Sequence, residues 1–170
     1  SLTSLVIPDS VTYLGESAFQ DCANLNSISI GEGIEEIGST AFLFCNNIEE
    51  VHIKDLSAWC NIKFTDSGSN PLCCGANLIL NSEKIVELHI PESVTNIREY
   101  AFYNCDDIIS ITIPNNVTMI GEQAFNGCVD LTDISVNEEN KHYSSDNGVL
   151  YNKDKTKLIQ YPSGNERTNY

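Results

Sequence analysis

The stretch IISITIPNNVTMIGEQAFNGC, residues 108–128, decides the fold of this 170-residue chain because the chain repeats it. Its nine-residue ending, which closes on Ala-Phe-x-x-Cys, occurs at 14–22, 37–45, 97–105 and 120–128. Phe19 and Phe42 are 23 residues apart, as are Phe102 and Phe125, whereas Phe42 and Phe102 are 60 apart. One unit therefore carries 14 residues beyond the period. A fixed period of this size predicts a solenoid, in which each unit buries its apolar side only against its neighbours.

Each unit opens with an apolar-x-apolar alternation, such as Ile111-Thr112-Ile113. This pattern with β-branched residues predicts a short parallel strand whose apolar side chains point inward. A proline such as Pro114 then ends the strand, since proline has no N–H and a fixed φ. Gly121 predicts a bend, and Ala-Phe predicts a short helical or 3₁₀ turn on the opposite side. The recurring Phe and Cys are expected to stack into packing ladders, and not to take part in catalysis.

Composition narrows the class of partner. Twenty-four acidic residues stand against nine basic ones, which gives a net charge of −15. Binding to nucleic acid and to anionic membranes depends on Lys and Arg, so both partners are disfavoured. The chain has no apolar run long enough to insert into a membrane. Four of the seven cysteines share one place in the repeat and none forms C-x-x-C, which favours small buried hydrophobes over metal ligands. No cofactor is expected.

The pattern L-x-x-I-x-I-P-x-x-V-T-x-I-G-x-x-A-F-x-x-C, almost intact at 108–128, resembles the BspA-type (treponemal-type) leucine-rich repeat. The resemblance covers the whole chain, including the irregular segments 55–81 and 143–162. It implies an α/β-type horseshoe with its parallel sheet on the concave face. It also implies secreted or surface-displayed proteins, mostly of host-associated microbes, that adhere to host matrix proteins or other cells, without enzyme activity. Arg98 in a glycine position and the pair Cys73–Cys74 depart from the pattern.

The repeat count predicts one domain, 1–170, of about six 23-residue units. It carries an insertion within 54–84 and an irregular C-terminal unit, 131–170. Solenoids need polar caps at their ends, and neither end of this sequence has an obvious one. Because 167–170 also resembles the start of a further unit, we expect a fragment of a longer surface protein.

The strand residues that point outward are expected to form the binding face. They make two rows, Ser4, Ser27, Glu50, Glu87, Ser110, Asp133 and Val6, Ser29, His52, His89, Thr112, Ser135. The candidate site residues are Glu50, His52, Glu87, His89, Ser110, Thr112 and Asp133. Because neighbouring strands lie roughly 4.8 Å apart, the two Glu–His pairs are expected to converge. The cluster has three interpretations: a zinc-type metal site, a patch for a macromolecule, or solvated side chains without a role. A strand at 78–80 between the two histidines would separate them.

Two β-hairpins are expected to protrude, one from 78–80 into 85–90 and one pairing 149–151 with 158–161. Insertions in repeat proteins often carry binding specificity. Trp59, the single tryptophan, is either an exposed contact residue or an anchor of the insertion on the core. The sequence leaves open whether Cys60 forms a disulfide with Cys73 or Cys74.

No G-x-S-x-G, H-E-x-x-H or G-x-x-x-x-G-K-[ST] motif is present. The sequence therefore predicts a non-catalytic, secreted or cell-surface module that binds a protein partner, with a basic partner favoured by the acidic surface. Host extracellular matrix and other cell-surface proteins are the expected partner classes. The alternative is a structural spacer that displays another domain. A hydrolase built on the Glu/His cluster ranks third.

Overall fold

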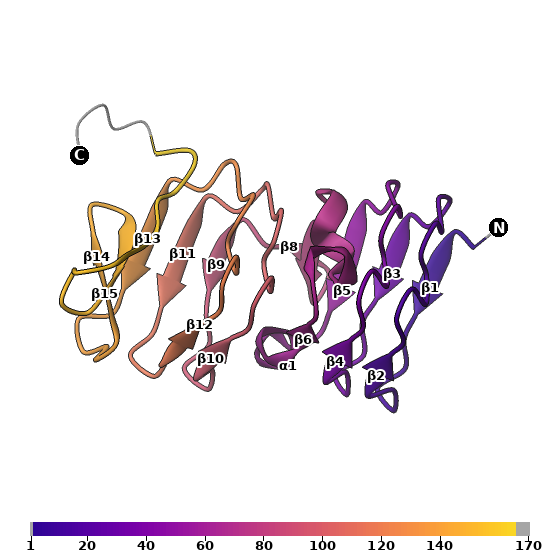
Figure 1. Ribbon diagram of the computed structural model, residues 1–170, viewed down its shortest axis with the longest axis horizontal. Coiled ribbons are helices and arrows are strands. Elements are labelled where there is room, and N and C mark those ends of the chain that lie inside the picture. Colours follow the sequence, from indigo (N-terminus) through magenta and orange to yellow (C-terminus); the bar gives the residue numbers. More distant parts are fainter. Residues whose placement is uncertain (1, 166–170) are drawn as a thin grey trace.

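The computed structural model describes residues 2–165, which form an elongated solenoid (Figure 1). One side, which we call the long-strand face, is a row of three- and four-residue strands. Its N-terminal part pairs the parallel strands β1 (Ser4–Val6), β3 (Ser27–Ser29), β5 (Glu50–Ile53) and β7 (Asn77–Leu80). Its C-terminal part pairs β9 (Glu87–His89), β11 (Ser110–Ile113) and β13 (Asp133–Val136). The predicted parallel strands are thus confirmed, but they belong to two sheets.

A second ladder of two-residue strands follows the long strand of each unit, in segments where the sequence predicted no strand. Its members are β2 (Tyr13–Leu14), β4 (Glu36–Ile37), β6 (Lys63–Phe64), β10 (Asn96–Ile97) and β12 (Met119–Ile120). β2, β4 and β6 form one sheet, and β10 and β12 form another. Both ladders are therefore interrupted at the same part of the solenoid, next to the insertion.

The Ala-Phe segments are hydrogen-bonded turns and not the expected helical turns. Ala41 N donates to Gly38 O over 3.3 Å, and Cys45 N donates to Phe42 O over 3.1 Å. Thr40 and Phe44 have positive φ, which a helix does not contain. Among residues 2–165 the helices lie in the insertion: α1 (Leu56–Asn61), η1 (Ser67–Ser69) and η2 (Pro71–Cys74). The chain therefore does not form the helical side of an α/β horseshoe.

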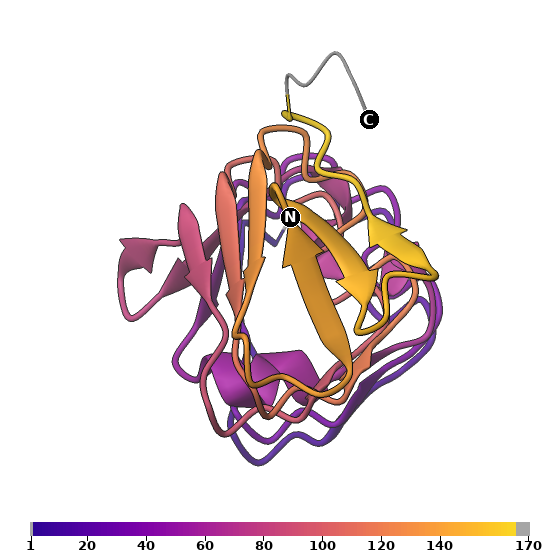
Figure 2. The same cartoon turned by 90° about the vertical axis from the view of Figure 1, so that its left-hand side faces the viewer.

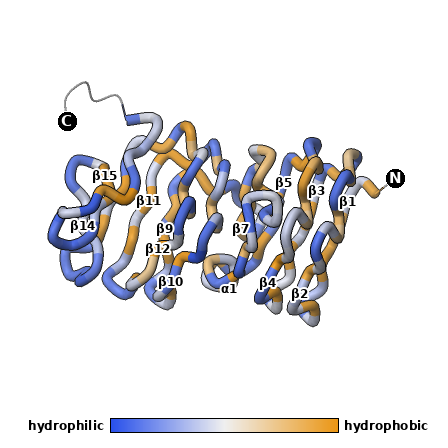
Figure 3. Tube along the Cα trace, in the orientation of Figure 1, coloured by the Kyte–Doolittle hydropathy of each residue, from blue (hydrophilic) through white to orange (hydrophobic). Residues whose placement is uncertain are grey.

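The core consists of the repeated apolar positions, which recur from turn to turn (Figure 3). Phe19 stacks on Phe42 with 5.4 Å between ring centroids, and Phe102 stacks on Phe125 at 5.9 Å. The repeat cysteines lie beside these rings, and Cys45, Cys105 and Cys128 are buried. The predicted packing role of both residue types is confirmed.

The insertion adds a hairpin to the long-strand face. β7 turns through Asn81 and Ser82 into the antiparallel strand β8 (Glu83–Lys84). The sequence predicted this hairpin but extended its second strand over 85–90, whereas β9 of that segment belongs to the next sheet. Figure 2 shows the hairpin, in magenta, projecting away from the body of the solenoid.

A three-stranded antiparallel sheet lies across the C-terminal end of the solenoid (Figure 2). It consists of β14 (Tyr143–Asp146), β15 (Val149–Asn152) and β16 (Leu158–Gln160). The β15–β16 hairpin was predicted, and β14 was not. The buried Val149 and Leu150 and the buried amide of Asn140, which donates to Pro114 O and Val117 O, fix this sheet to the last turns. Residues 167–170, in which the sequence predicted the start of a further unit, lie outside the described residues.

Candidate binding face

The two predicted rows lie in register on the long-strand face. Ser4 pairs with Ser27 and Ser27 with Glu50, and in the other sheet Glu87, Ser110 and Asp133 form one line. The inward neighbours on the same strands, such as Ile28 and Ile111, are fully buried. Alternation along each strand therefore places the candidate residues on the exposed surface.

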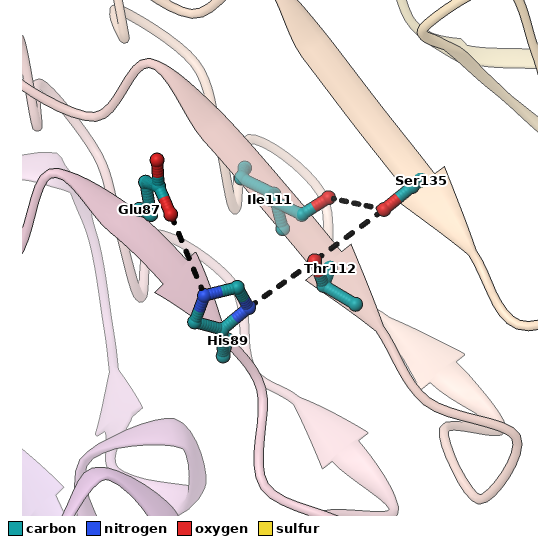
Figure 4. A network of polar contacts seen from close by, with 5 residues as sticks. All are labelled: Glu87, His89, Ile111, Thr112 and Ser135. Carbon is teal, nitrogen blue, oxygen red and sulfur yellow. Dashed lines mark hydrogen bonds and ion pairs between the residues drawn. The ribbon is translucent and has the colours of Figure 1, made fainter.

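A hydrogen-bonded network crosses three strands of the C-terminal sheet (Figure 4). His89 Nε2 lies 3.8 Å from a carboxylate oxygen of Glu87, and His89 Nδ1 lies 3.3 Å from Thr112 Oγ1. Ser135 Oγ donates to Ile111 O and to Thr112 Oγ1, each over 3.4 Å. Ser135 is a member of the network that the sequence left out of the candidate site. The contacts run from β9 through β11 to β13 and connect these side chains across the face.

The other Glu–His pair stands alone on β5. His52 Nε2 lies 2.9 Å from Glu50 Oε2, and the residues paired with these two are Ser27 and Ser29 of β3 on one side and Asn77 and Ile79 of β7 on the other. The expected convergence of the two pairs is wrong because β7 and β8 stand between β5 and β9. Within residues 2–165 no group of three or more His, Cys, Asp or Glu side chains is arranged to hold a metal ion.

Trp59 is an anchor of the insertion and not a surface contact. Its side chain is buried at 1% exposure, and its ring packs 5.2 Å from that of Phe64. Its indole N–H donates to Ala101 O over 2.8 Å, so the polar end of the ring has a partner inside the protein. α1 thus joins the insertion to the following turn. Of the two interpretations of Trp59, the anchor is confirmed and the exposed contact is wrong.

The seven cysteines are free thiols. Cys60 lies buried in α1, and burial raises the pKa of its thiol to about 12. Cys73 and Cys74 end η2 with their sulfur atoms 3.5 Å apart, and burial raises the pKa of Cys73. The disulfide from Cys60 that the sequence left open is not formed.

A hollow of about 630 Å³ lies away from the long-strand face, beside the second ladder. Its lining includes Glu35 and Glu36 together with Lys63 and Arg98. Lys63 pairs with Glu36 at 3.1 Å, so part of this charge is neutralised within the wall. No helix within residues 2–165 is long and apolar enough to cross a membrane.

Parallel strands stacked at one repeat per turn, with ladders of Phe and Cys inside and small polar side chains outside, define a leucine-rich repeat protein. The chain belongs to the BspA-type leucine-rich repeat family, whose model matches residues 1–67 and 58–170 with six copies of the repeat. The family resemblance seen in the sequence is confirmed.

No match was found among curated proteins. A solved leucine-rich repeat protein from Eubacterium ventriosum is similar, with 26% identity and a TM-score of 0.60 over 98% of this chain and 40% of that one. The pneumococcal vaccine antigen PcpA has the same fold, with 24% identity and a TM-score of 0.52 over 99% of this chain and 38% of that one. The chain therefore spans about two fifths of the length of these structures.

Proposed function

We propose that this domain is a non-catalytic, secreted or surface-displayed module that binds a protein partner with its long-strand face. Host extracellular matrix proteins and the surface proteins of other cells are the partner classes that the family implies. The observation that carries the proposal is the exposed array itself. It presents two registered rows of mostly polar side chains on two sheets, with three of the strands linked by the His89–Thr112–Ser135 contacts.

Such an array suits a large partner because many weak contacts can form along a broad surface. The face also holds the acidic side chains of Glu50, Glu87 and Asp133 in a chain of net charge −15. A partner with a basic surface is therefore favoured, both in encounter rate and in orientation.

The test compares the purified chain with the variant Glu50→Ser, His52→Ser, Glu87→Ser, His89→Ser against a panel of extracellular matrix proteins at physiological salt. The matched control is Glu16→Ser, Glu122→Ser, which removes the same two negative charges from exposed turns away from the face. We expect one panel member to bind the native chain and the control equally and the four-site variant at least about tenfold more weakly.

Equal binding of all three proteins would place the contact elsewhere on the molecule. Binding of no panel member by the native chain would contradict the proposed partner class and favour a spacer that holds another domain at a distance.

A further inference from the structure

In the hairpin, β8 pairs with the edge of β7 with which the next strand of the solenoid would otherwise pair. Ile85 N donates to Leu78 O over 3.0 Å, and Leu80 pairs with Glu83. The backbone groups of β7 that point toward the next turn are therefore already bonded to β8. β9 is the next strand of the solenoid and stays in another sheet.

The consequence is an open edge on β9. Val86 O accepts from Ile109 N over 2.9 Å, and Ile90 N donates to Thr112 O over 3.1 Å, so these residues direct their backbone groups toward β11. Backbone groups of alternate residues in a strand point to opposite sides. Glu87 and His89 therefore direct their N–H and C=O groups toward the hairpin side. Within residues 2–165 these groups have no backbone hydrogen-bond partner, and β9 pairs with β11 alone.

The side chains at this edge are exposed, and the strand carries only part of the protection common at sheet edges, namely its short length and the charge of Glu87. The side chains of Glu87 and His89 are 64% and 69% exposed. β9 contains neither proline nor lysine, two residues that commonly prevent pairing at an edge. The hairpin beside it projects out of the sheet (Figure 2) and does have such a lysine, Lys84.

The charges around the edge indicate which chain would pair with it. Glu83 and Glu87 are exposed on either side of the turn that joins β8 to β9. Lys84, the nearby cation, is paired with Asp107 at 2.7 Å, so among the described ion pairs Glu83 has no partner and Glu87 has His89, at 3.8 Å. An extended segment with lysine or arginine side chains matches this surface.

We propose that the edge of β9 is a docking site for an extended, lysine- or arginine-bearing segment of the partner, which adds a strand to the long-strand face. This inference rests on the proposed function and assigns it a mode of contact. The main-chain hydrogen bonds of Glu87 and His89 supply affinity, and the acidic side chains select the sequence of the segment.

The test uses a synthetic peptide that alternates lysine and valine, and two variants of the chain at one position. His89→Pro removes the outward N–H while the bonds of Leu88 and Ile90 to β11 stay in place, because proline is tolerated on edge strands. His89→Ser removes the imidazole but keeps the N–H and serves as the matched control. We expect His89→Pro to bind the peptide at least about tenfold more weakly than His89→Ser, because the two variants share the loss of the imidazole and differ in the outward N–H.

A second peptide, with its central amides N-methylated, keeps the charge and loses the hydrogen bonds. It should bind the native chain at least about tenfold more weakly than the parent peptide, and this comparison needs no variant to fold. Amide hydrogen exchange should also show fast exchange at Glu87 and His89 in the free chain and protection with the parent peptide.

Equal binding of both peptides would show attraction by charge alone and would overturn the inference, as would no binding of the parent peptide. These results leave the proposed function intact if a matrix protein still binds the long-strand face. If no matrix protein binds, the proposed function fails whatever the peptide does.

Discussion

At the scale of single residues, burial decides which conspicuous side chains are available for function. Trp59 and the repeat cysteines are the residue types most often associated with contacts and chemistry, and the structure places them in the core. Cys128 Sγ donates to Phe102 O over 3.2 Å, and Cys45 Sγ donates to Phe19 O over 3.0 Å. The thiols therefore bond to the turn beside them and link neighbouring units.

Trp59→Phe should lower the free energy of unfolding by about 1–3 kcal/mol, because it removes a buried hydrogen bond to Ala101 O and part of a packed ring. The measurement is urea denaturation followed by circular dichroism. Tyr13→Phe is the control, since Tyr13 is 55% exposed and its change should stay within about 0.5 kcal/mol. A Trp59→Phe protein as stable as the native chain would contradict the anchoring role.

The buried thiols should make the fold sensitive to alkaline pH. Burial raises the pKa of Cys60 and of Cys128 to about 12, above the value of an exposed thiol. The folded state thus holds these protons more tightly than the unfolded state. Their contribution to stability is complete below about pH 8.5 and is lost as pH rises toward about 12.

Urea denaturation at about pH 7 and about pH 10 measures this loss, which is roughly 1.4 kcal/mol per thiol for each pH unit above the unfolded pKa. The variant Cys60→Ala, Cys128→Ala should lose less stability between the two pH values than the native chain does. An equal loss in both proteins would show that other groups cause the alkaline sensitivity.

At the scale of elements, turns decide where the strands pair. Asn81 and Ser82 both have positive φ, at 50° and 71°, which is the geometry of a tight turn between antiparallel strands. This turn sends β8 back along β7 and thereby separates β7 from β9. The two Glu–His pairs end up in different sheets for this reason.

Ser82→Gly should stabilise the chain by about 0.5 kcal/mol, because glycine adopts positive φ without the steric penalty that serine has there. Ser10→Gly is the control at an exposed position whose φ is not positive, and it should be neutral or slightly destabilising. Thermal unfolding of the two variants compares them directly. A loss of stability in Ser82→Gly would contradict the assigned turn.

Sequence predicts the longer strands and the two hairpins, and it misses the two-residue strands and the arrangement around the insertion. The period and the alternation at Ile111-Thr112-Ile113 were sufficient for the strands, the inward face and the Phe ladder, since each signal appears several times. The second ladder was missed because a two-residue strand such as Glu36–Ile37 has too few positions for an alternation. β7 has the inward pattern of a regular strand, but its place between β5 and β9 depends on a turn that the period does not describe.

The candidate site was predictable only in part. The register of Glu87, Ser110 and Asp133 follows from the repeat and was found. The neighbours of Glu50 depend on the insertion, and the sequence left open whether a strand at 78–80 separates the two Glu–His pairs. The burial of Trp59 depends on a carbonyl 42 residues away, and no local pattern indicates that contact.

At the scale of the whole molecule, charge is the dominant property. A net charge of −15 on 170 residues produces self-repulsion in the folded state, which salt screens. Raising NaCl from about 0.05 M to about 0.5 M should therefore increase the melting temperature by several degrees. A melting temperature that falls over this range would show that the ion pairs, such as Lys155 with Asp146, outweigh the repulsion.

Hydrogen–deuterium exchange of the chain with a bound matrix protein tests whether the long-strand face is the binding surface. We expect binding to slow exchange in β3, β5, β7, β9 and β11, with the strongest effect at Glu87 and His89. The turns that carry Glu16 and Glu122 should be unchanged. Protection confined to those turns or to the second ladder would contradict the account, because the partner would then contact the opposite side of the solenoid.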